Sequence, residues 1–135
     1  SFIPIIIGMG GNIGTQSSTI IVRGLATGRI NIGNELMIII KELKTGLILG
    51  VLYGIMLGIF GSFRFLDTNP LIGVVVGLSI CSSMIIATGV GTLTPLVLRK
   101  LDIDPAIASG PFVTTSLDIL GVLIYFSIAG FLLQI

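Results

Sequence analysis

The chain has 135 residues, of which 53% are hydrophobic and only 10% are charged. A soluble domain of this length usually carries about a quarter charged residues, so the composition excludes an ordinary water-soluble domain and indicates a membrane protein. The formal net charge is +1, which gives no sign of a nucleic-acid partner. The chain has no histidine and one cysteine, so we expect no Cys/His metal site and assign Cys81 to packing.

Charged residues divide the chain into long apolar runs, the last of which is interrupted only by Asp118. The runs cover residues 1–22, 45–63, 68–98 and 105–135. A helix needs about 20 apolar residues to cross the hydrocarbon core of a bilayer. We therefore predict an all-α fold, a polytopic transmembrane bundle of four spans that occupies residues 1–135 as one domain. The opening SFIPIII lacks a methionine and a basic segment, so we expect a piece of a longer chain rather than a signal peptide.

Basic residues gather in two of the three connections. Connections 23–44 and 99–104 would share one side of the membrane, and 64–69 would lie on the other. The first side carries Arg23, Arg29, Lys41, Lys44, Arg99 and Lys100, and the second carries Arg64. The positive-inside rule then places 23–44 and 99–104 in the cytoplasm and predicts a multi-pass protein of the inner or plasma membrane.

The first run contains PIIIGMGGNIGTQ, which has two possible interpretations. The glycines resemble a dinucleotide-binding turn, but no alternation of strands and helices follows, so we set that interpretation aside. On a helix, polar residues instead fall on one stripe, namely Asn12, Thr15, Gln16, Thr19 and Arg23. Within a membrane such a stripe must face water or other helices, so it serves either an ion pathway or helix packing.

The second run follows INIGNELMIIIKELKTG, which we predict to be an amphipathic helix on the cytoplasmic surface that leads into the span. A solvated linker is the alternative. Within the span, glycines recur every four residues and would present one face for close helix packing. They are Gly46, Gly50, Gly54 and Gly58.

The last run places Asp118 about 20 Å into a helix that starts at Pro105, near the middle of the bilayer. A charged side chain there costs about 2.5–3.5 kcal/mol, so a functional site is expected. The residues in line with it are Ile107, Pro111 and Tyr125, with Thr114 and Thr115 beside them. Pro111 would free the carbonyl of Ile107, and these oxygens suit Mg²⁺, Ca²⁺ or a hydrated cation. A protonated aspartic acid in a packing contact and a proton relay are the alternatives.

Three stretches together resemble the MgtE family of magnesium transporters and channels. They are GMGGNIGTQSSTIIVRGLATG, KELKTGLILG and LTPLVLRKLDIDPAIASGPFVTTSLDILGVLIYF. The resemblance implies a membrane domain of five spans that forms a homodimer in the lipid bilayer, with the ion path between subunits. The four spans here would be the second to fifth, without the first span and without the cytoplasmic regulatory region that contains paired CBS modules.

The resemblance also implies roles for individual residues. Asp118 would hold hydrated Mg²⁺, which is both the transported ion and the ligand, beside the backbone oxygen of Thr114 and the side chain of Asn12. The remaining positions are expected to line the pore, and they are Gln16, Ile107, Gly110, Pro111 and Gly121. Some family members carry asparagine where this chain has Gly110, so a side-chain ligand is missing there.

We therefore expect a protein that transports divalent cations and is not an enzyme, since the sequence shows no nucleophile–base pair. Two other functions stay open. A non-transporting membrane scaffold would use the polar stripes for helix packing. A proton- or sodium-coupled carrier would show a flux that depends on pH or on Na⁺.

Overall fold

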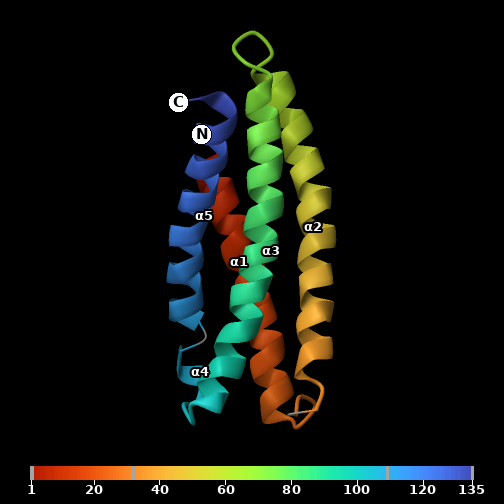
Figure 1. Ribbon diagram of the computed structural model, residues 1–135, viewed down its shortest axis with the longest axis vertical. Helices are drawn as coiled ribbons and strands as arrows, with labels where there is room; N and C mark the ends of the chain where they lie inside the picture. Colours follow the sequence, from red (N-terminus) through yellow and green to blue (C-terminus); the bar gives the residue numbers. More distant parts are fainter. Residues whose placement is uncertain (1, 32, 109, 135) are drawn as a thin grey trace.

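The computed structural model describes residues 2–31, 33–108 and 110–134. These residues form four long helices and one short one, without a strand. The helices are α1 (Ile3–Ala26), α2 (Glu35–Arg64), α3 (Leu71–Lys100), α4 (Pro105–Ala108) and α5 (Gly110–Leu133). Figure 1 shows the long helices side by side, with the two ends of the chain toward the end of the bundle that holds the α2–α3 connection. The predicted all-α membrane bundle is confirmed.

Three of the described helices, α2, α3 and α5, are long and apolar enough to cross a membrane. Helix α1 has 24 residues, which at about 1.5 Å per residue is also enough to cross the hydrocarbon core. Its stripe of polar residues distinguishes it from the other three. It packs along α3 and α5. In the sequence it covers the first of the four predicted spans. The chain is therefore a multi-pass membrane protein.

Helix α3 is the centre of the bundle and packs against α1, α2 and α5. Its inward face contributes Val76, Ile80 and Met84 to the main hydrophobic core, each at most 3% exposed. Helices α1 and α5 complete this core. Their buried members are Phe2, Ile6, Ile13, Val113 and Leu117. Because α3 has neighbours on three sides, small residues recur along its surface.

Glycines let α2 lie directly against α3. A Cβ atom built on Gly54 would lie 2.7 Å from the carbonyl oxygen of Gly77, and one on Gly50 would lie 3.0 Å from that of Cys81. Gly46 meets the side chain of Thr88 in the same way. The spacing of four residues therefore places backbone against backbone over several turns, as small-residue seams do in membranes.

Helix α1 approaches α3 as closely, at Gly14 and Gly91. A Cβ atom on Gly91 would clash with the carbonyl oxygen of Gly14, which is a backbone atom and cannot rotate away. One turn earlier, a Cβ atom on Gly10 would lie 2.7 Å from the hydroxyl of Ser83. The close approach of α1 to α3 thus depends on the absence of side chains at these positions.

The end of the bundle that carries most of the basic residues is closed by polar contacts. Lys100 Nζ lies 3.1 Å from Glu35 Oε2, and a guanidinium nitrogen of Arg99 donates to the carbonyl oxygen of Ile30 at 3.3 Å. The first contact joins the end of α3 to the start of α2, and the second joins it to the α1–α2 connection. The segment predicted as an amphipathic helix continues without a break into the span, because α2 begins at Glu35.

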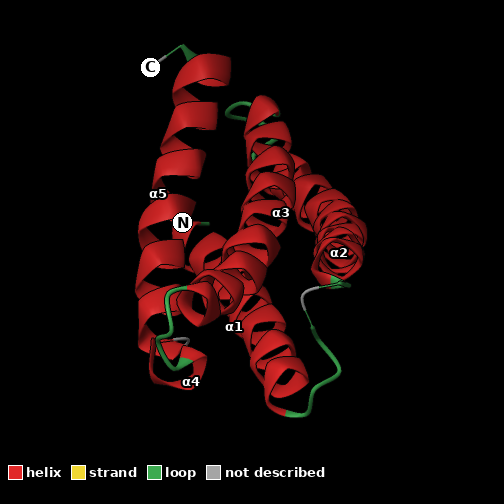
Figure 2. Cartoon of the chain, turned by 60° about the horizontal axis from the view of Figure 1, so that its bottom comes forward, coloured by secondary structure: helices red, strands yellow, loops and turns green. Residues whose placement is uncertain are grey.

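The last run is described in two pieces, because position 109 lies outside the described residues. Helix α4 ends at Ala108 and α5 begins at Gly110, and Figure 2 draws them on either side of that position. The continuous helix from Pro105 and the freeing of the Ile107 carbonyl by Pro111 stay predictions.

Substituting Gly91 tests the close approach of α1 and α3. Gly91→Ala should destabilise the folded protein by about 1–3 kcal/mol, because the added methyl group meets the backbone of Gly14. Gly89→Ala is the matched control, since a Cβ atom there meets only the side chain of Leu43 at 3.7 Å. The control should be neutral or slightly stabilising, as alanine favours helix. Thermal unfolding in detergent measures both, and equal midpoints would contradict this packing.

Candidate functional site

The polar stripe of α1 lies on the outside of the chain. Asn12, Gln16, Thr19 and Arg23 are all exposed, whereas Thr15 is half-buried. The hydroxyl of Thr15 donates to the carbonyl oxygen of Gly11 at 2.8 Å, and that of Thr19 donates to the carbonyl oxygen of Thr15 at 2.8 Å. The two threonine hydroxyls are therefore satisfied within the helix. The amides of Asn12 and Gln16 remain available to a ligand or a partner.

Asp118 extends from α5 beside α1. A Cβ atom built on Gly11 would lie 4.0 Å from Asp118 Oδ1, so the carboxylate sits next to a gap on α1 where a side chain is missing. Gly11 directly precedes Asn12, and the fold thus brings the two predicted metal ligands to neighbouring positions on adjacent helices. Asp118 is exposed and has no hydrogen bond or ion pair with any residue that the structure describes.

The first turns of α5 supply the other polar atoms near Asp118. The hydroxyl of Thr114 donates to the carbonyl oxygens of Gly110 at 3.2 Å and of Pro111 at 3.1 Å. In a regular helix the carbonyl oxygen of Thr114 accepts one bond from residue 118, which leaves its second lone pair free. Thr115 and Pro111 are exposed. The backbone oxygen of Thr114, rather than its hydroxyl, is thus the atom able to face an ion.

Three more predicted positions belong to the last run. Gly121 is buried, and a Cβ atom there would lie 3.6 Å from Ile7 of α1. Tyr125 is half-buried against the main core. Ile107 belongs to α4, and its side chain lies outside the described residues.

One chain does not complete a metal site in its described part. No group of three or more Cys, Asp or Glu side chains in that part could hold a metal ion. The candidate site offers one carboxylate, two amides and a backbone carbonyl on an outward face. These oxygen atoms can orient a hydrated cation, and a full set of ligands requires water or a second chain.

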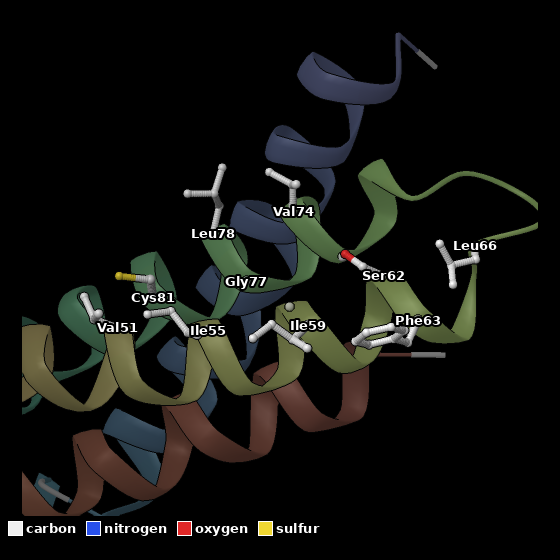
Figure 3. A pocket seen from close by; sticks show the side chains of 13 residues that line it. Val51, Ile55, Ile59, Ser62, Phe63, Leu66, Val74, Gly77, Leu78 and Cys81 are labelled. Atoms are coloured by element: carbon white, nitrogen blue, oxygen red, sulfur yellow. The ribbon is translucent and has the colours of Figure 1, made fainter.

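An apolar groove lies elsewhere, between α2 and α3. It has a volume of about 660 Å³ and lies near the α2–α3 connection, as Figure 3 shows. Its walls are apolar side chains such as Ile55, Ile59 and Phe63, and no charged residue lines it. Such a groove offers no charged ligand for a cation.

The structure places Glu42 differently from the prediction. Glu42 was assigned to the amphipathic surface helix, but it is buried at 7% exposure, and the hydroxyl of Ser17 donates to its carboxylate at 2.8 Å. The available signal was its spacing of four residues from Gly46. In α2 this spacing puts Glu42 on the glycine face that packs against α3.

Comparison with known proteins gives consistent matches. The family model described as "MgtE: Divalent cation transporter" matches residues 3–128. The chain is 41% identical over 128 residues to the magnesium transporter MgtE of Bacillus subtilis, which covers 95% of this chain and 28% of the relative. It is 39% identical over 133 residues to that of Thermus thermophilus, with 98% and 29% covered. The relative from Enterococcus faecalis is 39% identical over 134 residues, again with 98% and 29% covered. The chain thus spans less than a third of the length of these curated relatives.

Thiol labelling tests whether the polar face meets water. In a Cys81→Ser background, cysteines at Asn12, Gln16 and Asp118 should react with a membrane-impermeant thiol reagent, because their surroundings are predicted to be wet. A cysteine at Ile48 of α2 is the matched control, since Ile48 is 66% exposed, apolar and away from the polar face of α1 and α5. It should react at least about tenfold more slowly, because the thiolate is the form that attacks the reagent and lipid disfavours the thiolate. Equal rates at all four positions would contradict a water-filled face.

Proposed function

Because the chain belongs to the MgtE family of divalent cation transporters, we propose that it carries Mg²⁺ across the membrane as part of a longer transporter. The observation that carries this proposal is an unpaired, exposed Asp118 on a helix apolar enough to span the bilayer. A charge at that depth needs water, a cation or a protein partner. A cation that passes through a wet pathway meets this requirement.

The pathway would lie between two copies of the chain. The polar face of α1 and α5 has no cover within one chain, and a polar face cannot lie against lipid without cost. A two-fold axis beside Asp118 would place a second carboxylate opposite the first, with Asn12 and Gln16 of both copies above and below. The site would thereby gain the ligands that one chain lacks.

The chemistry of the site suits a hydrated Mg²⁺. This ion gives up its water reluctantly, and one or two carboxylates commonly hold it through several retained waters. Asp118 would attract the ion electrostatically, while the amide of Asn12 and the carbonyl oxygen of Thr114 would accept hydrogen bonds from its waters. Hydrated binding is weak enough to release the ion toward the other side, which transport requires.

Two other functions are less well supported. In a scaffold that uses polar residues for packing, Asp118 should be paired with a neighbouring helix, whereas no described residue pairs with it. A carrier coupled to protons or Na⁺ would use the same carboxylate, and it differs by a flux that depends on pH or on Na⁺. No covalent chemistry is proposed, and the curated relatives carry the name of transporters.

Mg²⁺ influx into proteoliposomes tests the proposal on the full-length protein. Asp118→Asn should lower the influx at least about tenfold, because a neutral amide of the same shape removes the charge that attracts the ion. Asp118→Glu should keep part of the influx. Asp67→Asn is the matched control, since Asp67 is exposed in the α2–α3 connection and away from the site.

The control should transport like the parent protein. An Asp118→Asn protein that is folded and transports at the parent rate would refute the role of Asp118. Influx that requires Na⁺ or a pH gradient would favour the coupled carrier instead.

A further inference from the structure

Glu42 is an acidic residue buried inside the bundle, and transport through Asp118 leaves it without a role. It lies on α2 at 7% exposure, and its carboxylate Oε2 accepts a 2.8 Å hydrogen bond from the hydroxyl of Ser17 on α1, which is 1% exposed. Among the described residues, Lys100 forms an ion pair with Glu35, and no ion pair includes Glu42. A buried carboxylate with one neutral hydrogen-bond donor is unusual and costly, so packing alone does not explain it.

The level of Glu42 in the bundle strengthens this point. Its partner Ser17 lies six residues beyond Gly11, the residue beside Asp118, which corresponds to about 9 Å along α1. The hydrocarbon core extends about 15 Å from its middle. If Asp118 is near the middle, Glu42 is also inside the hydrocarbon layer, where an ionisable residue suggests function.

The contact joins α1 and α2, two helices that otherwise pack mainly against α3 rather than against each other. A small cluster around Ile21, Ile30 and Leu96 includes Ile38 and Ile39 of α2. Aliphatic contacts are not directional and allow a helix to turn slightly about its axis. A buried hydrogen bond to a carboxylate is directional and strong, and it fixes that rotation.

The rotation of α1 decides where its polar stripe points. Ser17 follows Gln16 directly, so the bond at Ser17 holds one side of α1 while Asn12 and Gln16 occupy the exposed side. We propose that Glu42 is a positioning residue for transport, which fixes α1 through Ser17 so that Asn12 and Gln16 face the ion path. This inference rests on the proposed function, but the rotation itself can be measured without transport.

Four variants of the full-length protein separate this role from a purely structural one. Glu42→Leu and Ser17→Ala should each lower Mg²⁺ influx per folded protein about tenfold and shift the half-saturating Mg²⁺ concentration, because small misplacements of polar groups are costly. The double variant should be no worse than either single one. Glu42→Gln keeps an acceptor for Ser17 and should stay within about twofold of the parent.

Thr92→Val is the matched control. Thr92 is fully buried, and its hydroxyl has no hydrogen-bond partner within the described residues. Thr92→Val therefore removes a buried hydroxyl without breaking a hydrogen bond between helices. It should transport like the parent. The proposal is overturned if Glu42→Leu lowers only the yield of folded protein, or if Glu42→Gln is as harmful as Glu42→Leu while Ser17→Ala is normal. The second result would mean that the charge acts directly.

A thiol at position 16 reports the rotation itself. In the Cys81→Ser background, Gln16→Cys should change its rate of modification by a membrane-impermeant reagent when Glu42→Leu is added, and should keep its rate when Thr92→Val is added. An unchanged rate with Glu42→Leu overturns the positioning role whatever the influx shows. Absence of Mg²⁺ influx in the parent protein would instead refute the proposed function, and the labelling result would still be informative.

Discussion

Close contact between helix backbones is the constraint on which this structure depends. Along α3, glycines on α2 and on α1 remove the side chains that would otherwise separate the axes, and the clash that a Cβ atom on Gly91 would make with Gly14 shows how little room remains. In a bilayer there is no hydrophobic gain from burying apolar side chains against one another, so such contacts provide much of the association energy. They also fix which faces of α1 and α5 are left uncovered.

The uncovered face is the polar one, and this has a direct consequence for the site. Once Gly10 and Gly14 hold α1 against α3, Asn12 and Gln16 must point away from the bundle. Asp118 joins them from α5 because Gly11 leaves room for its carboxylate. Packing and function therefore use opposite sides of the same helix. A partner or water has to cover the polar side, since lipid cannot do so without cost.

The carboxylates of Asp118 and Glu42 differ in their surroundings. Asp118 is exposed on the outside of one chain, with no partner among the described residues, which leaves it free for a mobile ion. Glu42 is buried between α1, α2 and α3 and accepts a hydrogen bond from Ser17. The first arrangement suits reversible binding, and the second suits holding one helix in place. In the two proposals the same chemical group serves different purposes because its solvent access differs.

The sequence by itself determined the class of the fold and the residues that carry charge into the membrane. Apolar runs of about 20 residues require helices there, because only helices satisfy their own backbone in lipid. For the same reason, the stripe from Asn12 to Arg23 and the isolated Asp118 could be recognised from spacing alone. The glycine seam of α2 was likewise visible, since four residues are nearly one helical turn.

Only the tertiary structure decided where these groups meet. It brought the carboxylate of Asp118 beside Gly11, and it showed that the carboxylate of Glu42 reaches Ser17 across 25 positions of sequence. A periodic pattern states which residues share a face of one helix, but it does not state which neighbour that face meets. That choice depends on how closely whole helices can approach one another, and here it was made by the glycines that bring α1 and α2 against α3.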